Sequence, residues 1–221
     1  VVRGGKIKAI GQDEDFRPLY EEMDPLKYDA VLCPICGYAA LFKNFESALP
    51  AHVKRVNEQI TPQFMGIDQD GYSYSYDDAI IRYKMALLCD IVSKTPNSRR
   101  AYTCLKLSWV IRGKIENEKP YLDMRQIKYL EADEYECIQN AFDGFEAAYN
   151  TERFPLCGMD DVTVTYLLAI LAFKLQLYRK SLEYSYKVLG NQMANAKIKN
   201  MALELKYRIK DIIAVDVNDE N

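Results

Sequence analysis

The chain has 221 residues, of which 49% are hydrophobic and 28% charged, with a formal net charge of −3 and a pI of about 5.4. This composition supports a folded core and excludes a general binder of nucleic-acid backbones, which needs a concentrated basic surface. No apolar run approaches the roughly 20 residues that cross a bilayer, and no secretory signal opens the chain. The first residue is Val1 rather than Met, which indicates a piece of a longer protein.

Residues 1–70 form the first predicted region, a small irregular module with five of the eight prolines and five of the ten glycines. Apolar runs at 6–10 and 28–33 predict two short strands around an acidic loop. The spacing of apolar side chains over 38–49 predicts a helix that ends near Pro50. Because so small a module buries little surface without a metal or disulfide, we expect its first thirty residues to be loosely anchored.

The second predicted region is helical and covers residues 71–215. Ser75 and Asp78 resemble a capping box at the start of its first helix, which Pro96 stops. Apolar residues at three- and four-residue spacing predict further helices from 97 or 98, at about 124–149, from 160 or 161, at 178–190 and at 196–212. The acidic residues 216–221 should form a disordered tail.

An internal repeat is suggested by residues 165–190. Ala169 and Ser181 are small, whereas Tyr178, Tyr184 and Val188 supply bulk at the spacing of a tetratricopeptide unit. Residues 98–114 resemble the first helix of another such unit. The predicted fold is therefore mainly α: a tetratricopeptide-like antiparallel helix array behind a small irregular β, zinc-ribbon-like module. An ordinary helical bundle is the alternative.

The sequence CPICG at 33–37 is the strongest chemical motif. Cys33 and Cys36 are spaced to hold one zinc ion, but structural zinc takes four ligands. A second cysteine pair upstream could complete the site, or His52 with a distant ligand such as Cys157 could do so. A thioredoxin-type redox pair or two idle thiols are the other readings.

Other residues point away from catalysis. Three further cysteines at 89, 104 and 137 lie in apolar helical patterns, which predicts reduced, buried thiols and a cytoplasmic protein. His52 is the single histidine, and no nucleophile motif accompanies it. The acidic turn at 13–16 and the basic residues Arg99, Arg100, Lys106 and Arg112 are predicted to be solvated. Tyrosines gather at 72–83 and 178–186; most should pack between helices, and a few should serve recognition.

Three segments carry a family resemblance: GQDEDFRPLY at 11–20, DPLKYDAVLCPICGYAA at 24–40 and FPLCGMDDVTVTYLLAIL at 154–171. Over about residues 3–190 the chain resembles the uncharacterised bacterial proteins of domain-of-unknown-function family 2225. Members of that family open with another Cys-x-x-Cys pair just upstream of a segment like VVRGGKIK. The resemblance implies that Cys33 and Cys36 are the second half of a four-cysteine zinc site, followed by tetratricopeptide-like helices. This sequence lacks the first pair, so zinc is expected in the intact protein and not necessarily in this piece.

We therefore expect a cytoplasmic protein-interaction module with a structural zinc knuckle. Its partner would be a protein or peptide segment in the groove of the helix array, because repeat arrays make extended binding surfaces. Nucleic acid and membranes are not expected partners, and no catalytic set of residues is evident. The alternative is a metalloenzyme or thiol redox protein centred on Cys33 and Cys36.

Overall fold

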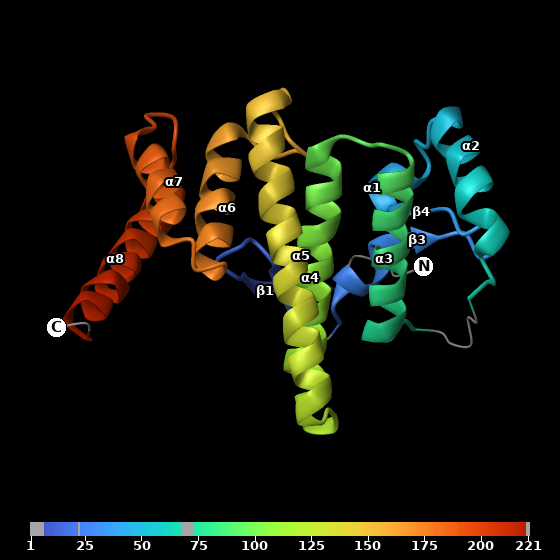
Figure 1. The fold of residues 1–221 in the computed structure, drawn as a ribbon, viewed down its shortest axis with the longest axis horizontal. Coiled ribbons are helices and arrows are strands. Elements are labelled where there is room, and N and C mark those ends of the chain that lie inside the picture. Colours follow the sequence, from blue (N-terminus) through green and yellow to red (C-terminus); the bar gives the residue numbers. More distant parts are fainter. Residues whose placement is uncertain (1–6, 22, 68–72, 220–221) are drawn as a thin grey trace.

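In the computed structural model, residues 7–21, 23–67 and 73–219 are described. The larger part is a row of antiparallel helices in which each helix packs mainly on its neighbours in the chain (Figure 1). These helices are α3 (Tyr76–Val92), α4 (Asn97–Glu118), α5 (Met124–Thr151), α6 (Asp161–Lys174), α7 (Tyr178–Gly190) and α8 (Ala196–Asp219), with the 3₁₀ turn η4 (Lys119–Tyr121) between α4 and α5. The prediction of a mainly α fold is confirmed.

The N-terminal part contains two small antiparallel sheets, each with two strands among the described residues. β1 (Ala9–Gln12) pairs with β2 (Pro18–Tyr20), and β3 (Ala30–Leu32) pairs with β4 (Ala39–Leu41). The remaining elements are η2 (Pro25–Tyr28), α1 (Phe42–Phe45), α2 (Pro50–Gln59) and η3 (Thr61–Gln63).

The helix predicted at residues 38–49 is wrong except for the single turn α1 (Phe42–Phe45). Ala39, Ala40 and Leu41 are buried in strand β4, which pairs with β3 and packs on α3. Pairing and burial outweigh a short helical spacing, since strand formation depends on the surrounding structure. Pro50 begins α2 instead of ending a helix, because the first helical turn does not use the missing N–H group.

The helix starts were predicted correctly where a polar cap marks them. Ser75 and Asp78 form both hydrogen bonds of a capping box at α3, and Asp160 caps α6. Helix α8 continues to Asp219, past residue 215, where the sequence predicts the start of the tail. Among the described residues, no helix combines the length and apolar character needed to cross a bilayer.

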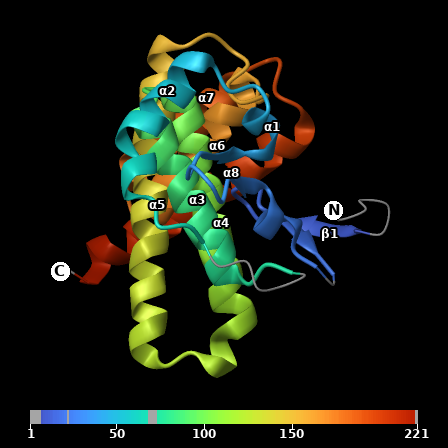
Figure 2. The same ribbon diagram turned by 90° about the vertical axis from the view of Figure 1, so that its right-hand side faces the viewer.

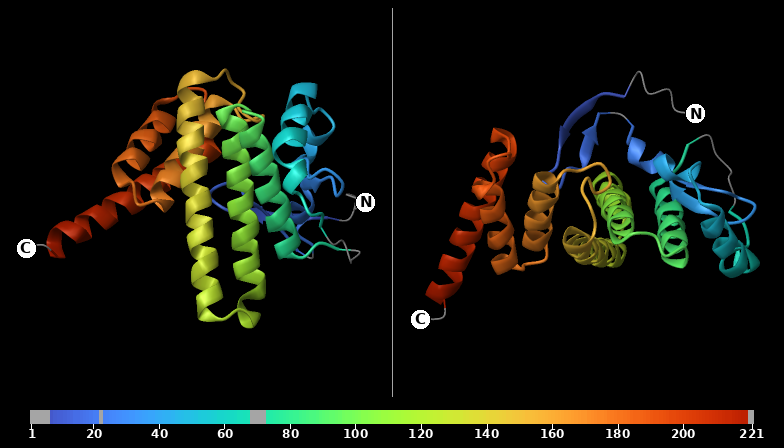
Figure 3. Two further views of the ribbon diagram at one scale, coloured as in Figure 1. Left: turned by 45° about the vertical axis from the view of Figure 1, so that its right-hand side comes forward. Right: turned by 90° about the horizontal axis from the view of Figure 1, so that it is seen from above.

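The N-terminal strands lie across one face of the helix row (Figure 3). Leu26, Ala30 and Leu41 belong to the same hydrophobic core as the helices, and Asp15 and Arg17 are buried. The expectation that the first thirty residues are loosely anchored is therefore wrong for those that are described. Helices α4 and α5 extend together beyond the rest of the row, whereas β1 projects from its side (Figure 2).

Candidate functional site

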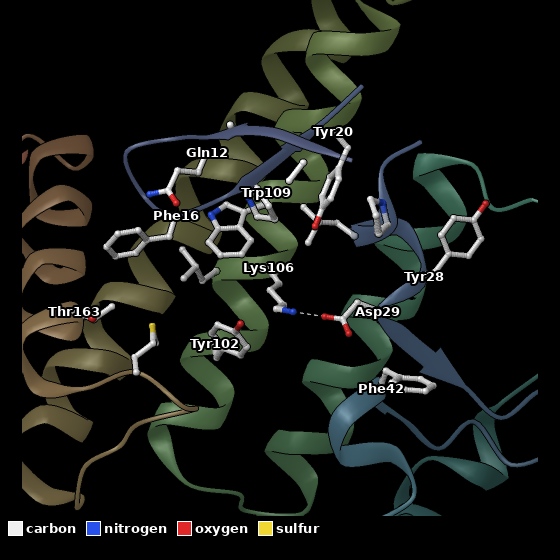
Figure 4. A pocket seen from close by; sticks show the side chains of 17 residues that line it. Gln12, Phe16, Tyr20, Tyr28, Asp29, Phe42, Tyr102, Lys106, Trp109 and Thr163 are labelled. Atoms are coloured by element: carbon white, nitrogen blue, oxygen red, sulfur yellow. Dashed lines mark hydrogen bonds and ion pairs between the residues drawn. The ribbon is translucent and has the colours of Figure 1, made fainter. Parts of the chain in front are cut away.

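A cavity of about 700 Å³ lies between the β1–β2 hairpin and the helix row. We call it the aromatic groove, since six aromatic side chains line it: Phe16, Tyr20, Tyr28, Phe42, Tyr102 and Trp109. It opens to solvent beside Phe42, whose side chain is 67% exposed. Figure 4 shows Phe16 and Phe42 at opposite ends, with Lys106 and Asp29 between them. A cavity of this size and lining is typical of a binding site.

One stripe of helix α4 forms the wall of the groove. Tyr102, Lys106 and Trp109 recur at the four- and three-residue spacing that places side chains on one face of a helix. The hairpin forms the opposite wall, with Ala9, Gly11 and Gln12 of β1 lining the cavity. Small side chains on the strand thus face large ones on the helix, which leaves the space open.

The indole N–H of Trp109 is a buried donor in this wall that lacks a hydrogen-bond partner among the described residues. Its residue is only 4% exposed, and its indole Nε1–H reaches no acceptor in the part of the chain that is described. In Figure 4 the indole lies between Phe16 and Tyr20, with its nitrogen turned toward Gln12 at one end of the groove. A buried donor without a partner costs about 1–3 kcal/mol. Such a group in a cavity wall indicates a place where a ligand can supply an acceptor.

An ion pair lies in the middle of the groove. Lys106 donates to a carboxylate oxygen of Asp29, and its ammonium lies 4.9 Å from the ring centroid of Tyr102. Burial lowers the pKa of Lys106, but the nearby Asp29 carboxylate outweighs burial and raises that pKa above its ordinary value. Since these are the only Lys and Asp that line the groove among the described residues, the lining carries no net charge.

A buried cluster of charges holds the hairpin against the helices. Asp15 is fully buried in the β1–β2 turn, and its carboxylate lies 2.7 Å from Nη2 of Arg112 on α4 and 3.4 Å from Nζ of Lys174 on α6. Burial raises the pKa of Asp15, but the two cations outweigh it and bring the pKa below its ordinary value of 3.8. Asp15 and Arg112 are therefore not solvated, contrary to the prediction, whereas Glu14 in the same turn is exposed as predicted.

The turn also carries a conformation that few residues adopt. Phe16 has a φ of 68°, in the left-handed region, and its ring packs 5.5 Å from that of Tyr166 on α6. Arg17, the next residue, donates from Nη1 to the carbonyl oxygen of Trp109 at 3.5 Å. The strained turn persists because packing and hydrogen bonds fix it on both sides. The groove therefore has a wall in a fixed position.

Cys33 and Cys36 lie in the turn of the β3–β4 hairpin. The N–H of Gly37 donates to the carbonyl of Cys33 at 3.1 Å, and the N–H of Cys33 donates to the carbonyl of Tyr38 at 2.8 Å. Gly37 has a φ of +75°, and a Cβ there would lie 2.7 Å from the ring of Phe64. The CPICG sequence thus forms a tight turn that requires glycine.

The two thiols differ in their protonation. Hydrogen bonds from the N–H groups of Cys36 and Ile35 lower the pKa of Cys33, because they stabilise the thiolate. Burial raises the pKa of Cys36. The pair begins a hairpin turn and not a helix, so it lacks the helix N-terminus that activates a thioredoxin-type cysteine.

As a metal site, the turn supplies half of a zinc shell. The two cysteine sulfurs could serve as two of the four ligands of a tetrahedral zinc site. Backbone N–H groups directed at the Cys33 sulfur would stabilise its thiolate form. No third cysteine, histidine, aspartate or glutamate of the described residues lies close enough to share an ion with them. His52 lies in α2 outside any such group, and Cys157 donates to the carbonyl of Ser98.

Cys89 is the thiol that sequence reasoning did not connect with this turn. It is 2% exposed on α3, and its sulfur accepts a hydrogen bond from the N–H of Ala39 at 3.3 Å. Burial raises its pKa to about 11, so it remains a protonated, structural thiol. All six cysteines are free thiols.

The aromatic groove was not predicted at the level of residues. The expected tyrosine clusters contribute little to it, because Tyr76, Tyr83 and Tyr184 are buried in the core. Tyr72 lies outside the described residues. The signal available in the sequence was the α4 stripe that alternates aromatic and basic side chains. Its counterparts on the hairpin lie about 90 residues away in the chain, so the sequence alone does not pair them.

The sequence model of a bacterial family described as "Uncharacterized protein conserved in bacteria (DUF2225)" matches residues 1–209. No curated protein and no solved structure matches the chain significantly.

Proposed function

The chain belongs to the uncharacterised bacterial family DUF2225, and we propose that it is a cytoplasmic protein-interaction module that binds a peptide segment of a partner in the aromatic groove. The observation that carries this proposal is the buried Nε1–H of Trp109, which has no acceptor among the described residues and lies in the wall of a cavity lined by six aromatic side chains. A ligand that supplies an acceptor there removes an unfavourable term and covers apolar surface at the same time.

The length of the groove favours a chain segment over a compact molecule. The lining extends from Phe16, packed against α6, to the exposed ring of Phe42 beside the β3–β4 hairpin. A segment laid along it would touch both the hairpin and α4. The fixed position of the hairpin reduces the ordering cost of binding, which increases affinity.

The helical part would then be a tetratricopeptide-like scaffold. What supports this is the close contact of α6 with α7 at Ala169 and the successive antiparallel packing of α3 to α8. Six free thiols suit a reducing cytoplasm.

We also propose that the CPICG turn holds a structural zinc ion together with ligands from outside the described residues. Zinc would fix the β3–β4 hairpin, which packs on α3 and continues into Phe42 at the end of the groove. A structural zinc site is closed by four protein ligands, so this role brings no catalysis.

Selection of random peptides displayed on phage tests the binding proposal. The immobilised protein should enrich a set of related peptides that bind with micromolar affinity. Phe42→Asp should abolish their binding because it places a charge at the mouth of the groove, whereas Leu49→Asp, at an exposed position outside the groove, should not. If nothing is enriched, or if the enriched peptides bind Phe42→Asp equally well, the proposal is wrong.

A further inference from the structure

We propose that the chain associates with a second copy of itself through the free end of helix α5, with the two α5 helices packed antiparallel. The surface involved, which we call the α5 seam, consists of Met124, Lys128, Glu131 and Tyr135. None of these residues lines the aromatic groove, so this inference goes beyond the proposed function and does not depend on it.

The α5 seam is a single stripe along one face of the helix. Its four residues follow one another at spacings of four, three and four, which is the pattern of contact positions in a coiled coil. One heptad further along the same face, Phe142 is 1% exposed and packs against Tyr184 of α7, with ring centroids 6.4 Å apart. The second half of this face is therefore covered within the chain, and the seam is its uncovered continuation.

The seam lies where α5 extends beyond the helices beside it. Helix α5 has 28 residues and α6, which packs on it, has 14, so the first half of α5 projects with α4 from the row (Figures 1 and 2). Met124 is 69% exposed and Tyr135 is 48% exposed. Two large side chains exposed on one face of a projecting helix indicate a surface that another molecule covers.

The two charges of the seam are free to bind a partner. The side chains of Lys128 and Glu131 form no ion pair or hydrogen bond within the described residues, and both are exposed. By contrast, Asp133 and Glu134 of the same helix each pair with a cation of α3 or α4 at 2.7 Å. The seam thus presents one free cation and one free anion between two apolar side chains.

The order of the four residues identifies a second copy as the partner. The midpoint between Lys128 and Glu131 is also the midpoint between Met124 and Tyr135. Two antiparallel copies centred there place Lys128 of each opposite Glu131 of the other, and Met124 of each opposite Tyr135 of the other. A contact between identical patches across a twofold axis requires this kind of self-complementarity. A parallel pair would instead place Lys128 opposite Lys128, and like charges in contact are unfavourable.

The same arrangement keeps the two helix rows apart. Each α5 continues into its own row beyond Tyr135, so in an antiparallel pair the two rows lie at opposite ends of the overlap. The overlap is short compared with a standard protein interface, and charged residues at coiled-coil contact positions fix orientation at a cost in stability. We therefore expect a weak, reversible dimer that forms at high protein concentration.

Sedimentation equilibrium between micromolar and millimolar concentrations tests the dimer. The average mass should rise with concentration from 25.5 kDa toward twice that value. Lys128→Glu and Glu131→Lys should each raise the dissociation constant at least about tenfold, because each places like charges in contact twice in the dimer. Lys197→Glu, at an exposed position on α8 outside the seam, is the matched control and should not change it.

Exchange of the two charges separates a direct contact from a disturbance of the fold. The double variant Lys128→Glu, Glu131→Lys should associate like the wild type, because every pair across the twofold axis is again of opposite charge. An equimolar mixture of the two single variants should also associate more tightly than either variant alone. Circular dichroism should be the same for all variants, since both positions are exposed.

The inference is wrong if the wild type keeps a mass of 25.5 kDa up to millimolar concentration. It is equally wrong if the single variants associate as tightly as the wild type, because the contact would then lie elsewhere. Failure of both the double variant and the mixture to recover association would also overturn it, since the two charges would not be partners.

Discussion

The hydroxyl of Ser181 on α7 donates to the carbonyl oxygen of Ala169 on α6 at 2.7 Å, and neither residue exposes any surface. Because the serine side chain is short, this direct hydrogen bond requires the backbones of α6 and α7 to lie close together at this point. Both residues were predicted from the sequence as the small contact between two antiparallel helices.

Ala169→Leu should destabilise the protein. Three further carbon atoms do not fit between α6 and α7 without moving a helix, and overpacking of this kind costs about 1–3 kcal/mol. The free energy of unfolding in urea gives the value. Ser47→Ala, at an exposed position, should leave it unchanged. Equal stability of Ala169→Leu and the wild type would mean that the two helices do not pack at this residue.

Gly37→Ala should destabilise the cysteine turn. The substitution requires a φ of +75° from a residue with a Cβ and places that Cβ 2.7 Å from Phe64. We expect a loss of about 1–3 kcal/mol in unfolding free energy. Gly190→Ala is the matched control, because a Cβ there meets nothing within 4 Å, and it should be neutral or slightly stabilising.

Arg112→Met should release the β1–β2 hairpin from the helices. It leaves the fully buried Asp15 carboxylate with Lys174 as its remaining cation, and loss of one partner from a buried pair costs about 3 kcal/mol or more. Hydrogen exchange of residues 9–20 should accelerate more than that of α6. Lys187→Met, which breaks an exposed pair with Glu183, should cost less than about 0.5 kcal/mol. A hairpin that stays protected in Arg112→Met would contradict this role.

Acid should weaken the same contact. The pKa of Asp15 is lower in the folded protein than its ordinary value of 3.8, so its contribution is complete above that value and is lost as the pH falls through the folded pKa. Asp15→Asn lacks this contribution at every pH. The difference in unfolding free energy between the wild type and Asp15→Asn should therefore shrink as the pH falls below 3.8. A difference that stays constant down to pH ~2 would contradict the assignment.

Zinc content tests the CPICG turn. The protein together with an upstream cysteine pair, purified under reducing conditions, should carry one zinc ion, and its Cys33→Ser, Cys36→Ser double variant should carry none, because structural zinc depends on thiolate ligands. Cys157→Ser should keep its zinc, which separates this site from the alternative that includes Cys157. Chelation should loosen the β3–β4 hairpin and leave the circular dichroism of the helices unchanged. Zinc retained by the double variant would show that these cysteines are not ligands.

The sequence predicted those features that depend on residues close together in the chain. The helices from α3 to α7 were recognised by spacing, and the starts of α3 and α6 by the caps at Ser75 and Asp160. The CPICG turn is equally local, and Gly37 adopts the positive φ that its position suggests. Where structure depends on distant partners, the prediction failed, as for strand β4.

The contacts around the aromatic groove could not be predicted from the sequence. Lys106 and Arg112 were predicted to lie on a solvated helix face, yet they pair with Asp29 and Asp15, 77 and 97 residues away. The sequence alone does not distinguish a buried basic residue from a solvated one, because the acidic partner of the buried residue can lie far away in the chain. The unsatisfied donor of Trp109 likewise exists only once the hairpin covers α4.

The hairpin that carries Asp15 leaves the ribosome long before the helices that receive it. Arg112 and Lys174 follow it by about 100 and 160 residues, and synthesis at roughly 5–20 residues per second separates Asp15 from Lys174 by about 8–30 seconds. The α3–α4 and α4–α5 pairs can form from near neighbours during that interval, because contacts close in sequence form fastest. Docking of the first strands on α6 is thus a later event of biosynthesis than formation of these pairs, and the aromatic groove is complete only after Thr163, which lines it, has been made.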